Sequence, residues 1–183
     1  MRKFLSFIWE IMKIAAIAFI IVVPIRYFLF QPFLVKGESM EPNFKDGNYL
    51  IVDEISYRFR EPKRGEVIVF KYPFMPSQKF IKRVIGLPGE TIKIEDGQLK
   101  ILKDGKVYIL NEKDYIPFVF NPNEKIEITL GPDEYFVLGD NRDFSYDSRR
   151  FGPVKKDLII GRVLIRAWPF GDFSKFEAPL YSF

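Results

Sequence analysis

The longest apolar stretch of the chain lies at its N-terminal end. Residues 14–25 contain no charge, and Lys13 and Arg26 stand at the two ends of this stretch. A membrane-spanning helix needs about 20 mostly apolar residues, which residues 11–30 supply if the two cations extend to the membrane interfaces. We therefore predict a membrane anchor over residues 1–34.

Two other interpretations of this stretch are less favoured. A helix buried in a soluble core is disfavoured because residues 15–23 are apolar on every face. A cleavable signal peptide requires small residues at its cleavage site, whereas residues 25–30 are all bulky. Arg2 and Lys3 favour a cytoplasmic N terminus, although cations such as Arg26 weaken the charge bias.

The remainder of the chain, residues 35–183, has the pattern of a mostly-β domain. Short runs rich in Val, Ile, Phe and Tyr recur between Gly, Pro, Asn and Asp residues. Asp96-Gly97 and Asp104-Gly105 each join two alternating runs, which indicates tight hairpin turns and a three-stranded meander. The predicted strands are Tyr49–Asp53, Glu66–Tyr72, Lys79–Ile85, Thr91–Glu95, Gln98–Leu102, Lys106–Leu110, Lys125–Leu130, Glu134–Leu138 and Leu158–Trp168.

The composition excludes several kinds of chemistry. The 183 residues include no histidine and no cysteine. A Ser-His-Asp triad, a His/Cys zinc site, a thiolate nucleophile and a disulfide are therefore excluded. The net charge of +4 suits a soluble surface, and mildly an anionic membrane, better than a nucleic-acid binder. An enzyme with this composition must use Ser, Thr, Lys, Tyr, Asp or Glu, or a hard metal held by carboxylates.

Two polar segments could carry chemistry. Ser39 stands between Gly37 and Pro42, where a bent backbone could present its hydroxyl, although composition alone favours a simple linker turn. Residues 139–150 hold two Ser, three Asp, one Asn and three Arg. A solvated loop and a rigid ion-paired loop both fit this composition, while a calcium loop is disfavoured by the carboxylate spacing and the nearby arginines.

Lys82 and Arg83 interrupt an apolar strand. Alternation along the strand turns one of the two cations toward the buried face. Arg83 keeps its charge at all ordinary pH values and cannot act as a base. Lys82 could act as one, because desolvation lowers the pKa of a lysine and a neutral amine can take a proton from a serine hydroxyl. A surface lysine is the ordinary alternative at such a position.

The order of three motifs carries more information than any one of them. Gly37-Glu38-Ser39-Met40-Glu41-Pro42 follows the apolar stretch, and Lys-Arg-x-x-Gly-x-Pro-Gly begins at Lys82. Gly-Asp-Asn-Arg-x-x-Ser-x-Asp-Ser-Arg begins at Gly139. In this order the motifs closely resemble those of bacterial type I signal peptidases, of the compact kind with a single anchor. The resemblance implies a fold of antiparallel sheets on one N-terminal transmembrane helix.

The resemblance also implies catalytic roles. Ser39 resembles the nucleophile, and Lys82 resembles its general base. Met40 resembles a residue that helps to line the substrate pocket. The backbone N–H of Ser39 would donate to the oxyanion. In some relatives a serine two positions before the nucleophile supplies a second donor, whereas this chain has Gly37 there.

Four further residues match supporting positions of the same motifs. Ser145 resembles the serine that hydrogen-bonds and orients the amine of the base. Asp147, Arg149 and Arg83 resemble a salt-bridged group that braces the site. No cofactor and no metal are implied.

The implied reaction is the removal of signal peptides from secreted preproteins by a Ser-Lys dyad. The implied partners are the signal peptides, membrane lipid and, indirectly, the secretion machinery, with no nucleic acid. The enzyme would be a single-pass protein of the cytoplasmic membrane, with its N terminus in the cytoplasm and residues 35–183 on the outer face. The alternatives are an autoprotease related to self-cleaving repressors, which the apolar anchor disfavours, and an anchored β binding module without catalysis.

Overall fold

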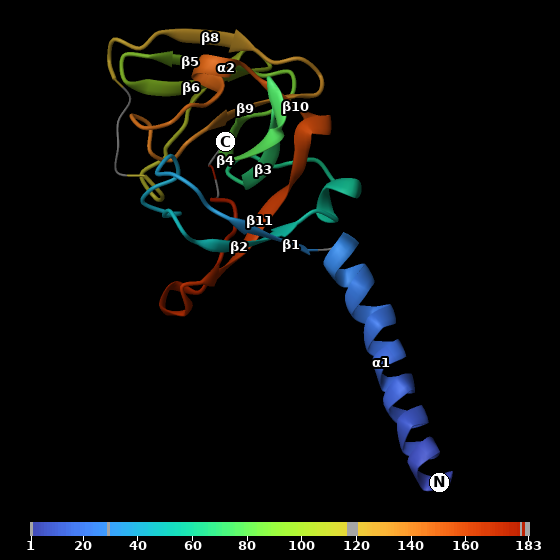
Figure 1. Ribbon diagram of the computed structural model, residues 1–183. Helices are drawn as coiled ribbons and strands as arrows, with labels where there is room; N and C mark the ends of the chain where they lie inside the picture. The colour runs from blue at the N-terminus through green and yellow to red at the C-terminus, as the bar shows by residue number, and fades with distance from the viewer. Residues whose placement is uncertain (1, 29, 117–120, 180, 182–183) are drawn as a thin grey trace.

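The computed structural model describes residues 2–28, 30–116, 121–179 and 181. One long helix, α1 (Arg2–Phe28), extends away from a mostly-β domain (Figure 1). The strands are β1 (Phe30–Leu34), β2 (Tyr49–Asp53), β3 (Val67–Tyr72), β4 (Met75–Gly86), β5 (Thr91–Glu95), β6 (Gln98–Lys103), β7 (Lys106–Ile109), β8 (Ile126–Thr129), β9 (Glu134–Leu138), β10 (Val154–Lys155), β11 (Ile159–Trp168) and β12 (Ser174–Lys175). The short helices are α2 (Ser148–Phe151), η1 (Ser56–Arg58), η2 (Lys156–Leu158) and η3 (Phe170–Asp172).

Helix α1 covers most of the predicted anchor. Its apolar side chains are exposed along the part whose side chains are described, for example Phe7 at 62%, Phe19 at 68% and Ile20 at 69%. Across the described residues, no helix combines the length and the apolar character that a membrane crossing requires. The structure thus does not confirm the predicted transmembrane helix.

The last residues of the predicted anchor segment belong to the β domain. Phe30–Leu34 form β1, which pairs antiparallel with β2 from Phe30 opposite Asp53 to Leu34 opposite Tyr49. Their apolar composition reflects a place in the sheet, because strands and membrane helices share the same bulky apolar residues. The helix itself ends at Phe28, and β1 follows it within the predicted anchor segment.

Each of the nine predicted strands overlaps a strand of the structure, and the strands build two antiparallel sheets. One sheet has the order β1-β2-β11-β3-β4-β9-β10, with β12 paired to β11. The other has the order β7-β6-β5-β8. The predicted meander of β5, β6 and β7 is confirmed, and the turn residues Asp96, Gly97, Asp104 and Gly105 all have positive φ. Two successive residues with positive φ are the signature of the expected hairpin turn.

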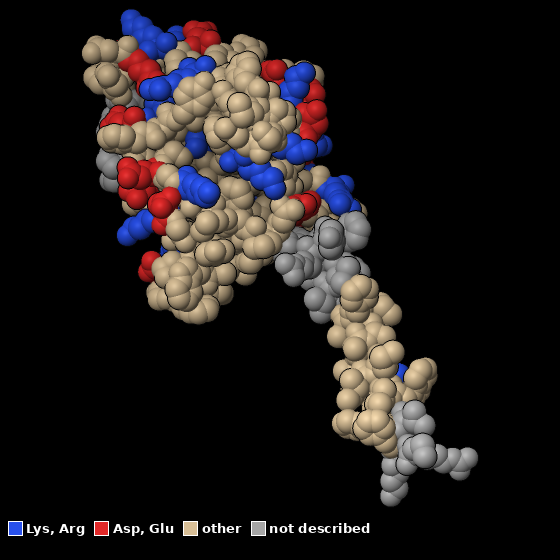
Figure 2. Space-filling view, in the orientation of Figure 1, with Lys and Arg blue, Asp and Glu red and all other residues tan. Residues whose placement is uncertain are grey.

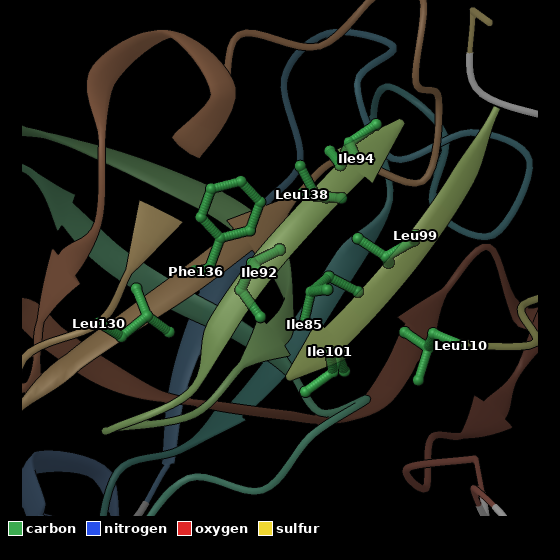
Figure 3. Packing of buried hydrophobic residues seen from close by; sticks show 9 residues of the cluster. All are labelled: Ile85, Ile92, Ile94, Leu99, Ile101, Leu110, Leu130, Phe136 and Leu138. Carbon is green, nitrogen blue, oxygen red and sulfur yellow. The ribbon is translucent and has the colours of Figure 1, made fainter. Parts of the chain in front are cut away.

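Two apolar cores fix the elements around the site. The smaller sheet packs on β4 and β9, where isoleucines 92, 94 and 101 meet Ile85, Phe136 and Leu138 (Figure 3). A second core lies under β2, β3 and β11 and includes Met40 and Phe44 from the segment after β1. The first core holds β4 in place, and the second holds the turn that carries Ser39.

Candidate active site

Ser39 lies in the turn that follows β1. Met40 and Phe44 fix this turn from one side, because both side chains are fully buried in the second core. Burying one side chain of this size contributes about 1.5–3 kcal/mol. From the other side, Asn141 donates its backbone N–H to the Ser39 carbonyl and its side-chain amide to the Glu38 carbonyl, each over 3.1 Å. The Ser39 hydroxyl is therefore presented from a backbone held at both sides.

Lys82 reaches Ser39 from β4. Its Nζ donates to Ser39 Oγ over 2.7 Å and to the Ile81 carbonyl oxygen over 2.9 Å. Lys82 is only 4% exposed, and β3 and β4 pair so that Ile68 stands opposite it. The structure thus brings together the two residues that the motifs single out.

Burial changes the acidity of the Lys82 amine. It lowers the pKa from its ordinary value of 10.5 to about 8, because the ammonium form loses its hydration. The negative charges of Asp147 and Asp140 act in the opposite direction and limit the fall. An amine with such a pKa is partly neutral near neutral pH, as general-base catalysis requires.

A groove of about 410 Å³ opens beside Ser39 and Lys82. Phe33 and Leu34 of β1 line one side, and residues 79–82 of β4 line the other. Within the described sheet, β1 pairs with β2 alone, and β9 pairs with β4 from Arg83 onward. Both strands thus have unpaired backbone edges, and an extended peptide can add to such edges as a further strand.

The predicted salt-bridge group separates into two ion pairs. Arg149 donates to Asp147 from Nε over 2.8 Å and from Nη2 over 3.0 Å, and the Gly139 N–H donates to the same carboxylate over 3.1 Å. Arg83 instead donates to Asp140, from Nε over 2.8 Å and from Nη2 over 2.7 Å. Arg83 is therefore a partner of Asp140, because it points away from Lys82 on the opposite side of the strand.

Asp140 is a site residue that the sequence interpretation did not select. It is completely buried, and Asn43 donates to its Oδ2 over 2.8 Å while also donating to the Tyr115 carbonyl over 2.7 Å. Asp140 therefore links β4, through Arg83, to the segment just after Ser39. The motif Gly139-Asp140-Asn141 contained this residue, but its partners lie 57 and 97 positions away.

A second buried pair supports the same loop. Arg142 donates to Glu112 through two hydrogen bonds of 2.6 Å and to the Gly139 carbonyl over 2.9 Å. Glu112 is likewise absent from the site residues predicted from the sequence. Bidentate pairing of this kind fixes direction as well as distance, so the pair holds the loop that carries Asp140 and Asn141.

Ser145 does not form the hydrogen bond to Lys82 that the resemblance implies. Its Oγ is buried and has no hydrogen-bond partner within the described chain. The atom lies against Gly139, where a Cβ would stand 2.2 Å from it. Ser145 is thus next to the site with an unused hydroxyl.

The structure also places Met40 and Gly37 relative to the groove. Met40 is fully buried in the second core and does not line the groove. It follows the serine in sequence, but the turn directs its side chain inward. Gly37 does lie on the groove, with φ of +86°, and its N–H donates to Asp46 Oδ1 over 2.7 Å. The amide of Gly37 is therefore already engaged.

We expect the substitution Gly139→Ala to damage the site. The new Cβ would stand 2.4 Å from the Ser39 carbonyl oxygen, so the serine turn must shift. Overpacking of this kind costs about 1–3 kcal/mol, and a displacement of about 1 Å can lower the rate about 100-fold. Thermal unfolding and peptide cleavage measure the two effects. Gly171→Ala is the control, because its Cβ would meet open space; equal behaviour of the two variants would contradict the close approach.

The Ser39 hydroxyl accepts a hydrogen bond from a buried amine and lies beside a groove with unpaired strand edges. This arrangement is the one that a serine hydrolase without histidine requires. The family model described as signal peptidase, peptidase S26, matches residues 8–168. The chain belongs to this family.

Two relatives found by sequence agree with the family. Signal peptidase IB of Staphylococcus aureus is 37% identical over 171 residues, which cover 86% of this chain and 88% of that protein. The probable signal peptidase I-2 of Synechocystis is 35% identical over 169 residues, covering 87% of this chain and 73% of that protein. A crystal structure of a signal peptidase I from Enterococcus faecalis V583 is 34% identical, with a TM-score of 0.46, and covers 56% of this chain and 97% of that chain. By family and by these relatives' names, the chain is a serine peptidase of the signal peptidase I type.

Proposed function

We propose that this protein is a membrane-anchored endopeptidase that removes signal peptides from secreted preproteins with a Ser39-Lys82 dyad. The hydrogen bond of 2.7 Å between Lys82 Nζ and Ser39 Oγ is the observation that carries the proposal. The lowered pKa of Lys82 supports it, since a neutral amine is required to accept the serine proton.

The reaction has two stages. The neutral Lys82 amine accepts the proton of Ser39 Oγ while the oxygen attacks the peptide carbonyl, and the resulting ammonium then protonates the leaving amine. Water attacks the acyl-enzyme in the second stage, again with Lys82 as base. The Ser39 N–H donates to the oxyanion. Since the Gly37 N–H is bound to Asp46, it does not serve as the second donor.

The groove supports an extended peptide substrate. Its unpaired strand edges offer backbone hydrogen bonds to a segment lying between β1 and β4. The aromatic side chains Phe33, Phe80 and Phe144 narrow it. Narrow apolar walls favour small side chains next to the cleaved bond, which is the usual character of signal-peptide cleavage sites.

The supporting residues act by position. Asp147 and Arg149 tie α2 to the end of β9, and Arg83 ties β4 to Asp140. We assign Ser145 the role of orienting the Lys82 amine once a substrate occupies the groove, because its hydroxyl is buried without another partner.

The anchor is part of the same proposal. Residues 14–25 carry no charge, and the described apolar side chains of α1 are exposed rather than packed on the β domain (Figure 1). A lipid bilayer is the medium that covers such a surface. In the proposed orientation the N terminus is cytoplasmic, residues 35–183 lie on the outer face, and preproteins arrive from the secretion machinery.

The function is tested by product analysis. The full-length chain in detergent is incubated with a purified preprotein, and the new N terminus is determined by mass spectrometry. We expect one cut, immediately after the signal peptide, and no cut by the Ser39→Ala variant. Ser174→Ala, an equal change on β12 far along the chain, is the control and should cleave normally. Cleavage that persists in Ser39→Ala would contradict the proposal.

A further inference from the structure

A second pocket lies next to the groove and is not used by the proposed reaction. Its volume is about 420 Å³, within the range of small-molecule sites. Lys79 lines both the groove and this pocket, so the two are neighbours. The other walls come from η1, β3 and the residues around η2, which contribute Arg58, Lys71 and Asp157.

Three cations line the pocket. Within the described part of the chain, the Arg58 and Lys71 side chains form no ion pair and no hydrogen bond. Lys79 makes one weak hydrogen bond, of 3.3 Å, to Gln31 Oε1. Guanidinium and ammonium groups that line one pocket and form no described ion pair suit a phosphate.

Two carboxylates, Glu54 and Asp157, line the same pocket. Glu54 Oε1 is buried and has no hydrogen-bond partner in the described structure. A carboxylate oxygen without a donor costs free energy, so this pocket favours a ligand that donates a hydrogen bond to the Glu54 carboxylate. The three cations and two carboxylates leave one positive charge, which matches a ligand with a single negative charge.

The pocket lies where the chain leaves the helix. Gln31 lines it and stands three positions after Phe28, the last residue of α1. Three extended residues span at most about 11 Å, so the pocket is close to the end of the anchor. Figure 2 shows basic side chains on the domain near the point where the helix joins it. If α1 spans the bilayer, as proposed above, this is the depth of the lipid headgroups.

We propose that this pocket binds the headgroup of an anionic phospholipid, a phosphodiester that carries hydroxyl groups. The phosphodiester contacts Arg58, Lys71 and Lys79, and a headgroup hydroxyl donates to the Glu54 carboxylate. A phosphoglycerol headgroup meets both requirements with one net negative charge. A bound headgroup would hold the groove at a fixed height above the membrane, where a signal peptide emerges. This inference rests on the proposed membrane anchor.

Lipid binding is measured directly, without peptide cleavage. The full-length Ser39→Ala chain in detergent is titrated with phosphatidylglycerol, and native mass spectrometry gives the apparent Kd of the first bound lipid. The double substitution Arg58→Gln and Lys71→Gln is then added to this chain; neither residue lines the groove. We expect it to raise the apparent Kd roughly tenfold or more. The added pair Lys106→Gln and Lys113→Gln, exposed lysines outside the pocket, removes the same charge and should change the Kd less than twofold.

Titrations with phosphatidylcholine and with inorganic phosphate show whether the pocket recognises an anionic lipid headgroup or any phosphate. Phosphatidylcholine has the same phosphodiester but no hydroxyl donor, and we expect it to bind more weakly than phosphatidylglycerol. Any of three results would overturn the proposal. The two double variants could lose affinity for phosphatidylglycerol equally, the two lipids could bind equally tightly, or inorganic phosphate could bind as tightly as phosphatidylglycerol. Because the assay uses an inactive chain, its failure leaves the peptidase proposal intact, and loss of peptidase activity does not affect its result.

Discussion

Replacing Lys82 by methionine should abolish peptide cleavage and, at neutral pH, stabilise the fold. Methionine has nearly the length of the lysine side chain but no titratable group, so Ser39 loses its base. Removing one member of a nucleophile and base pair costs a factor of about 10³ or more in kcat, and adding Ser39→Ala should reduce activity little further. Lys155→Met, an exposed lysine on β10, should cleave normally.

The stability gain follows from the pKa of Lys82. The pKa of Lys82 falls from 10.5 to about 8 in the folded chain. Since one pKa unit corresponds to about 1.4 kcal/mol, charging the buried amine costs about 3 kcal/mol. The methionine variant loses the hydrogen bonds to Ser39 and Ile81, worth about 1 kcal/mol each. We therefore expect a net gain of about 1 kcal/mol in the free energy of unfolding at pH 7.

The pH dependence has a definite sign. The pKa of Lys82 is lower in the folded chain, so the unfolded chain binds more protons between about pH 8 and 10.5. The destabilisation is complete below about pH 8 and disappears as the pH rises toward 10.5. Cleavage should fall as the pH drops through about 8, because the base becomes protonated.

The cleavage rate and the Tm are measured between about pH 6 and 11, a range that includes the folded and unfolded pKa values of Lys82. We expect the Tm advantage of the Lys82→Met variant to disappear and then reverse as the pH rises, because the penalty for charging Lys82 is lost while its two hydrogen bonds remain in the unsubstituted chain. A rate that does not change across neutral pH, or cleavage that survives in Lys82→Met, would rule out the dyad.

The strands were predictable because their signals are local. Alternating apolar runs and two Asp-Gly turns placed nine strands and the meander of β5 to β7 without any knowledge of pairing. β1 was missed because its apolar residues continue the apolar helix, and a bulky apolar run does not reveal where a helix ends and a strand begins.

The site was predictable in its residue types but not in its partners. The motifs indicated Ser39 and Lys82, and in the structure Lys82 Nζ lies 2.7 Å from Ser39 Oγ. The same motifs grouped Arg83 with Asp147, whereas its guanidinium pairs with Asp140. Motif order gives neither the face of a strand that a side chain occupies nor the direction of a turn, which is also why Met40 was expected in the pocket.

Asp140→Asn should be the most destabilising single change near the site. Asp140 is fully buried and accepts two hydrogen bonds from Arg83, which is 5% exposed. Asparagine keeps the shape but leaves the Arg83 charge buried without compensation, and breaking such a pair costs about 3–5 kcal/mol. In a chain of this size the Tm should fall by about 10 °C. Asp143→Asn, an exposed neighbour in the same loop, should change stability by less than about 0.5 kcal/mol.

A second substitution separates the charge from the packing. If the buried charge causes the loss, adding Arg83→Met to Asp140→Asn should restore part of the stability, because no uncompensated ion then remains. The negative charge of Asp140 also raises the pKa of Lys82, so in Asp140→Asn the rise of activity with pH should move to lower pH. A double variant that is less stable than Asp140→Asn would show that Arg83 contributes through its packing and its hydrogen bond to the Gly65 carbonyl, and not through pairing with Asp140.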